Sequence, residues 1–264
     1  MRTEGHPDKV NLAGYSKPSV ARWFGDQHGY FDPGEQVVLE AIAAEMAGGA
    51  ILDIGVGAGR TVPLLRAISE DYVAIDFSEE MVRQCRRRHP GVAVEVGDAR
   101  DLGRFATGSK DLVVFSCAGI DHVGHDDRQQ VLREGHRVLR AGGAFVFSTH
   151  NKHGAGHGER PWGSRRELTQ LRHMAGLALY LPINLRNHLR HRKLDVDAGG
   201  WSMRNAAFDH FSMVFHYTTV ANQAEELMAA GFQPGPEIYE FESGRRLEPG
   251  EDTDAWSMHV IART

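Results

Sequence analysis

The sequence of 264 residues is poor in cysteine and has no long apolar run. Its two cysteines, Cys85 and Cys117, are too few for a disulfide framework, and they lack the spacing of a zinc site. No stretch reaches the roughly 20 apolar residues that cross a bilayer, and the first residues lack the apolar core of a secretion signal. We therefore expect a cytoplasmic protein that has no membrane partner.

Positive charge is scarce in most of the chain and concentrated in one segment. The formal net charge is −5, but residues 151–193 hold nine Lys or Arg against two acidic residues. This segment therefore carries +7 and the remainder −12. A chain that is acidic overall gives no general reason to expect a nucleic-acid partner, so the basic segment needs a separate explanation.

Apolar strands alternate with amphipathic helices over the first 150 residues. Strands are expected at residues 50–54, 72–75, 92–96, 112–115 and 144–148, and further strands from residue 212 onward. Parallel strands need crossover connections that cover both faces of the sheet. The alternation therefore predicts one doubly wound α/β domain over residues 1–264, with a mostly parallel, seven-stranded sheet. Residues 1–48 are expected to form an N-terminal helical cap, and residues 151–211 an inserted lid after strand five.

A glycine-rich turn follows the first expected strand. Gly55, Gly57 and Gly59 let a ligand approach the backbone, because a side chain at these positions would occupy that space. A dinucleotide fingerprint needs a third glycine at the sixth position of the turn, where this sequence has Arg60. The turn therefore argues against an NAD site.

The segment from Ile51 to Gly59 instead resembles the first motif of class I S-adenosylmethionine (SAM)-dependent methyltransferases, which have a Rossmann-like fold. That motif is two apolar residues followed by Asp-x-Gly-x-Gly-x-Gly. The resemblance continues at the ends of the next strands and covers residues 50–149 most strongly. It implies SAM as cofactor, bound by Asp53, Gly55, Gly57, Gly59, Asp76, Phe77, Met81, Asp98, Ala99 and Ser116.

The resemblance also implies individual roles. Asp76 would accept hydrogen bonds from both ribose hydroxyls, a role that suits the two oxygens of a carboxylate. Met81 would pack against adenine, and Asp98 would accept from the adenine amino group. The turn Leu139–Gly143 resembles a further family motif, with alanine in place of the usual proline.

Methyl transfer is a displacement at a sulfonium, so the protein mainly aligns donor and acceptor and excludes water. A base is needed only where the acceptor loses a proton. The candidates at strand ends facing the methyl group are Asp121, His122, His150, Asn151, His216 and Tyr217. We favour His122 and His150 as catalytic residues, because histidine suits proton removal near neutral pH. The residues expected to contact the acceptor are Tyr15, Asn151, Arg165, Arg166 and His216.

No metal is expected. His150, His153 and His157 form a cluster in the sequence, but its spacing is glycine-rich and Glu159 is the nearby acid. That pattern is a poor match to the ligand sets of zinc and other transition metals.

Three functions remain open. We favour an enzyme of secondary metabolism that methylates O or N of a small molecule, with arginines of the lid selecting a polar or anionic acceptor. The alternative interpretation of the lid is a solvated charged face or, over residues 174–185, a homodimer surface. The second function is an RNA or protein methyltransferase whose +7 segment contacts phosphates. The third is a SAM-binding cyclase or regulator without methyl transfer.

Overall fold

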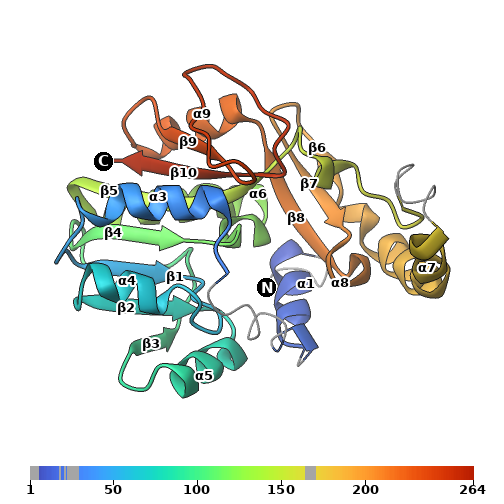
Figure 1. Cartoon of the computed structure of the whole chain (residues 1–264), viewed down its shortest axis with the longest axis horizontal. Helices are drawn as coiled ribbons and strands as arrows, with labels where there is room; N and C mark the ends of the chain where they lie inside the picture. The colour runs from blue at the N-terminus through green and yellow to red at the C-terminus, as the bar shows by residue number, and fades with distance from the viewer. Residues whose placement is uncertain (1–5, 18, 21, 23–29, 164–170) are drawn as a thin grey trace.

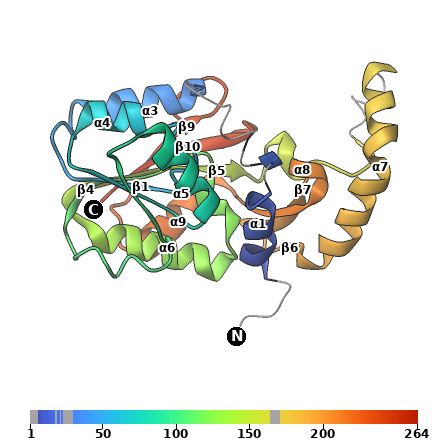
Figure 2. The same cartoon turned by 90° about the horizontal axis from the view of Figure 1, so that it is seen from below.

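The computed structural model describes residues 6–17, 19–20, 22, 30–163 and 171–264, with backbone only for residues 171–178. A central sheet is covered by helices on both faces (Figure 1; Figure 2). One face packs on α3 (Pro33–Ala43), α4 (Val62–Ile68) and α5 (Glu79–Arg88) through Leu39, Leu65 and Cys85. The other packs on α6 (His125–Val138) and α9 (Val220–Ala230) through Leu132 and Leu227. The α/β fold with a mostly parallel sheet is confirmed.

Seven of the strands form one continuous sheet. Their spatial order is β3 (Ala93–Val96), β2 (Tyr72–Asp76), β1 (Ile51–Ile54), β4 (Lys110–Phe115), β5 (Leu139–Asn151), β10 (Ser257–Arg263) and β9 (Glu237–Glu240). The pairs from β3 to β5 are parallel, and β10 lies antiparallel between β5 and β9. The strand order reverses between β1 and β4, and open α/β sheets bind ligands at such a point.

Three more strands extend this sheet at the end of β5. They are β8 (Met213–Thr218), β7 (Trp201–Ala206) and β6 (Val196–Asp197). His150 and Asn151 pair in parallel with the end of β8, and β7 and β6 follow as antiparallel neighbours. The described chain thus has ten strands, where the sequence predicts seven. Two of the additional strands, β6 and β7, lie in residues expected in the lid; β7 pairs with β8, and β6 pairs with β7. Side chains of mixed polarity give no local pattern that reveals these partners.

The described helices are α1 (Pro7–Tyr15), α3 (Pro33–Ala43), α4 (Val62–Ile68), α5 (Glu79–Arg88), η1 (Gly119–His122), α6 (His125–Val138), η2 (Ala155–Gly158), α7 (Leu171–His191), η4 (Arg192–Leu194), α8 (Phe208–Phe211) and α9 (Val220–Ala230). Side-chain caps set several of their starts. Asp32 accepts from the N–H of Glu35, and Ser78 from that of Met81. Within the described ranges, no helix is long and apolar enough to cross a membrane.

Two helical segments lie beyond the ends of the parallel strands. α1 lies against β8 and η1, while α7 lies at the outer end of the molecule beside α8 (Figure 1; Figure 2). α1 therefore borders the edge of the sheet where ligands are expected, whereas α7 does not.

Candidate active site

A cavity of about 420 Å³ opens at the carboxyl ends of the parallel strands. One part is lined by the loops that follow β1 to β4, and the other by α1, η1, β8 and α8. Eight of the ten predicted cofactor residues line it: Gly55, Gly57, Asp76, Phe77, Met81, Asp98, Ala99 and Ser116. The first part therefore gathers the residues that the sequence assigns to the cofactor.

The turn after β1 leaves room for a ligand. Gly57 has a φ of +56°, and a Cβ built on it would meet no atom within 4 Å. Its N–H donates to Asp76 Oδ2 at 2.9 Å, while the N–H of Ser78 donates to Asp76 Oδ1 at 2.8 Å. Each carboxylate oxygen keeps a lone pair for a further donor. The turn and Asp76 therefore fit a ligand that brings hydroxyl donors, as a ribose does.

Asp53 and Gly59 lie behind the turn and outside the cavity lining. Asp53 Oδ2 accepts from the hydroxyls of Thr61 at 2.6 Å and Tyr72 at 2.7 Å. A side chain at Gly59 would collide with His89, and its φ is +92°. Both residues hold the turn in place, and burial raises the pKa of Asp53 to about 6.

Arg100 pairs with Asp98, the residue whose carboxylate the resemblance assigns to the adenine amino group. Its guanidinium donates to both oxygens of Asp98, at 2.9 and 2.6 Å. The same group donates to Asp8 of α1 at 2.8 Å and to Asp127 of α6 at 3.0 Å. Arg100 thereby ties α1 to the first part of the cavity.

The loop after β4 has an unusual backbone. Cys117 and Ala118 have φ values of +54° and +51°, which cost energy in residues that carry a Cβ. The N–H of Ala118 donates to Ser148 Oγ at 2.7 Å. Such strain clusters at functional sites, and this loop lies between the two parts of the cavity.

His122 points into the second part of the cavity but is already paired. Its Nδ1 donates to the Gly119 carbonyl at 2.9 Å, so Nε2 accepts from the Tyr15 hydroxyl at 2.5 Å. Burial lowers the pKa of His122 to about 4. The ring therefore stays neutral near pH 7, and its lone pair is occupied by Tyr15.

His150 also lines the second part, and a buried carboxylate orients it. Asp121 Oδ2 accepts from the backbone N–H of His150 at 2.6 Å and from its Nδ1 at 2.8 Å. Burial raises the pKa of Asp121, but the hydrogen bond from His150 and the charge of Arg128 outweigh this effect and lower it. Asp121 is thus ionised and pairs with Nδ1 of His150, so Nε2 is the ring nitrogen left for another partner.

Aromatic side chains surround the two histidines. The Phe215 ring lies 5.1 Å from that of His150 at an interplanar angle of 9°, and 4.9 Å from that of His122 at 86°. Tyr217 lies 5.2 Å from His150. Phe208 packs 6.1 Å from Phe215. The second part of the cavity therefore presents flat, largely apolar walls.

Two predicted acceptor residues lie away from the cavity. Asn151 is buried and donates to the carbonyls of Thr253 and Ala255. His216 points to the opposite face of β8 from Phe215 and Tyr217, as alternate strand residues do, and burial lowers its pKa well below the ordinary value.

Other expectations fall outside the described part of the chain. Arg165 and Arg166 are not among the described residues. In the expected dimer surface, residues 174–185, the side chains of residues 174–178 are not described either.

The sequence offered little signal for Phe215, Phe208 or Arg128. They come from segments far apart in the chain, and Phe215 reads as an ordinary apolar strand residue. An alternating pattern at residues 213–218 does indicate that Phe215 and Tyr217 share a face.

Comparison with known sequences finds methyltransferases. A family model described as a methyltransferase domain matches residues 51–143. A probable S-adenosylmethionine-dependent methyltransferase of Mycolicibacterium smegmatis is 29% identical over 182 residues, covering 66% of this chain and 69% of that protein. A demethylmenaquinone methyltransferase of Beutenbergia cavernae is 38% identical over 117 residues, covering 43% of this chain and 47% of that protein. The chain thus spans about half to two thirds of the length of these two relatives.

Solved structures share the fold. The 1,6-didemethyltoxoflavin-N1-methyltransferase of Burkholderia thailandensis, solved with bound 1,6-didemethyltoxoflavin and S-adenosylhomocysteine, has a TM-score of 0.57 at 16% identity. The match covers 97% of this chain and 87% of that one.

Together, the sheet order, the glycine turn and Asp76 fit a Rossmann-like enzyme with a ribose-bearing cofactor at the switch point of its sheet. The chain is a class I SAM-dependent methyltransferase, and SAM is its cofactor.

Proposed function

We propose that this enzyme methylates an oxygen or nitrogen of a small, planar aromatic acceptor, and that His150 removes the acceptor's proton. SAM supplies the methyl group on a sulfonium. The observation that carries the proposal is the pair of His150 and Asp121 at a wall of aromatic rings.

The walls support an aromatic acceptor. Phe215 and Phe208 give apolar surface, and the rings of Tyr217 and His150 offer faces and edges to a second ring. Aromatic pairs with centroids 4.5–7 Å apart favour such offset or edge arrangements. A flat ring would therefore be held by shape, with its hydroxyl or amine directed at His150 Nε2.

The charges of the cavity argue against the anionic acceptor predicted from the lid. Among the described residues, the cavity lining includes Arg60 and Arg100, and both are paired with carboxylates. Arg160, Arg186 and Arg190 are not in the lining. The same pairing disfavours an acceptor that brings phosphates, as RNA does.

His150 has the geometry of a general base. With Nδ1 donating to Asp121, Nε2 accepts the proton, and the adjacent carboxylate stabilises the imidazolium that forms. Asp121 acts as a positioning residue, because it holds the ring and its tautomer. His122 is less suited, since the Tyr15 hydroxyl occupies its Nε2.

The test measures release of the demethylated cofactor with a panel of phenols and aromatic amines, beside matched aliphatic alcohols, aliphatic amines and carboxylic acids. We expect turnover with the aromatic set. With the best acceptor, His150→Gln should lower kcat by about 10²–10⁴-fold, because it removes the base, while the SAM affinity measured by calorimetry stays unchanged.

His153→Gln is the matched control. His153 lies close by in the sequence, but it is half exposed and pairs with Asp252 outside the cavity. This variant should keep the wild-type kcat. Turnover only with aliphatic anions would overturn the aromatic acceptor, and a wild-type kcat and pH profile in His150→Gln would overturn the base.

A further inference from the structure

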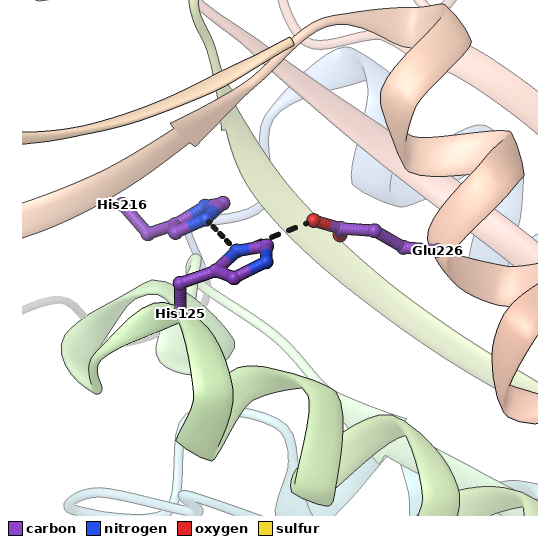
Figure 3. Close-up of side chains that lie close together, drawn as sticks. All are labelled: His125, His216 and Glu226. Atoms are coloured by element: carbon purple, nitrogen blue, oxygen red, sulfur yellow. Dashed lines mark hydrogen bonds and ion pairs between the residues drawn. The ribbon is translucent and has the colours of Figure 1, made fainter. Parts of the chain in front are cut away.

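We propose that His125, His216 and Glu226 bind one zinc ion behind the aromatic wall of the cavity. The three side chains come from the start of α6, from β8 and from α9, and they converge on one point (Figure 3). Neutral imidazole nitrogen and carboxylate oxygen are ligands that zinc prefers, and two His with one Glu is a known zinc ligand set.

The distances match a tetrahedral zinc site. His125 Nδ1 lies 3.2 Å from His216 Nε2 and 3.6 Å from Glu226 Oε1. The three donor atoms all lie within 4.8 Å of one another. Zinc bonds of about 2.0–2.2 Å at tetrahedral angles place neighbouring ligand atoms about 3.3–3.5 Å apart. One ion therefore fits between the donors with only small shifts of their side chains.

Neighbouring side chains orient two of the three proposed ligands, His125 and Glu226. The indole of Trp201 stacks on the His125 ring at 3.9 Å and 3°. Asn222 donates to Glu226 Oε1 at 2.9 Å, and Arg128 donates to Oε2. Partners of this kind fix ligand geometry in metal sites.

Charge and access also favour a cation. Arg128, Asp121 and Glu226 are all buried, so two carboxylates face one guanidinium, and the cluster has an excess negative charge. A bound cation would offset this charge. The side chain of His125 is 24% exposed, which leaves an entry path and room for water as the fourth ligand.

Such an ion would join three elements of the fold. It would hold α6 and α9, on one face of the main sheet, to β8 of the extension. His216 lies between Phe215 and Tyr217 on β8, so the ion would fix the strand that supplies the aromatic wall.

The experiment begins with metal analysis by mass spectrometry of the full chain purified without chelator. We expect about one zinc per chain. After removal of metal with a chelator, added Zn²⁺ at a hundredfold excess over its Kd should raise Tm by about 5–10 °C. Co²⁺ in its place should give the visible absorption of a tetrahedral site.

Two variants remove ligands. His125→Ala should weaken Zn²⁺ binding by about 100-fold or more, and it should fold because the side chain is partly exposed. Glu226→Gln should also weaken it, while its amide oxygen can still accept from Arg128. His153→Ala, which removes a histidine outside the cluster, should bind zinc as the wild type does.

The alternative is that the two rings only hydrogen-bond to each other. Wild-type protein without bound metal and without a Zn²⁺-dependent change in Tm would overturn the site. Equal zinc content in His125→Ala and wild type would overturn it as well. If Glu226→Gln does not fold, the comparison of His125→Ala with His153→Ala decides.

Discussion

At the scale of single residues, two buried carboxylates, Asp76 and Asp121, have opposite pKa shifts because their hydrogen-bond partners differ. Burial raises the pKa of Asp76 to about 6, and the two backbone N–H donors offset this only in part. Asp121 is equally buried, yet His150 and Arg128 keep it ionised. The first part of the cavity therefore contains a carboxylate with a pKa of about 6.

This pKa predicts how SAM affinity depends on pH. The raised pKa means that Asp76 takes up a proton as pH falls through about 6, and a protonated carboxyl offers fewer acceptor sites to the ribose. Affinity should be highest above pH 6 and about tenfold lower at pH 5 than at pH 7. Asp76→Asn should bind SAM about 1.5–3 kcal/mol more weakly at pH 7, with a flatter profile. Calorimetry at several pH values measures both, and equal wild-type affinities at pH 5 and pH 7 would contradict the assignment.

At the scale of elements, α1 is held by polar contacts rather than by a large apolar face. Asn11 is fully buried and donates to the carbonyls of His122 and Val214, at 2.8 and 2.7 Å, while its Oδ1 accepts from the Val214 N–H at 3.0 Å. One side chain thus joins α1 to η1 and β8, and it places Tyr15 against His122.

Replacing Asn11 should lower the stability of the protein and weaken acceptor binding together. Asn11→Ala leaves buried backbone groups without partners, so the free energy of unfolding should fall by about 1–3 kcal/mol in urea titrations. The acceptor KM should rise more than the SAM Kd, because Tyr15 borders the second part of the cavity. Ser16→Ala, at the exposed end of the same helix, is the control. Equal unfolding free energies for the two variants would refute the role of Asn11.

At the scale of the whole molecule, the last strand of the chain, β10, is inserted between two earlier strands of the sheet. β10 pairs with β5 on one side and β9 on the other, and Val260 is fully buried between Phe147 and Ile238. β6, in contrast, pairs with β7 alone among the described strands, and Val196 is 45% exposed. The chain therefore places its last strand inside the sheet, between β5 and β9.

A matched pair of proline substitutions tests this arrangement. Val260→Pro removes a ladder N–H inside the sheet and clashes with its neighbours, so the free energy of unfolding should fall by more than about 4 kcal/mol. Val196→Pro makes the same change at an edge, where it should cost less than about 1 kcal/mol. Denaturant unfolding followed by circular dichroism measures both. Similar losses in the two variants would contradict the strand order.

The cofactor half of the protein could be predicted because its residues lie close together in the sequence. Gly55, Asp76, Asp98 and Ser116 each follow a strand directly, and parallel strands bring their carboxyl ends to one edge of the sheet. Apolar runs and glycine turns are local signals, so the sequence alone determined the fold class, the cofactor and most residues of the first part of the cavity.

Only the tertiary structure decided how the acceptor half is built. The lid expected over residues 151–211 becomes partly sheet, because β7 finds its partner in β8. Asp121 meets His150, and His125 meets His216, across 29 and 91 residues of chain. Such long-range contacts depend on how whole elements pack. Side chains of mixed polarity have no periodic pattern in the sequence that indicates their partners.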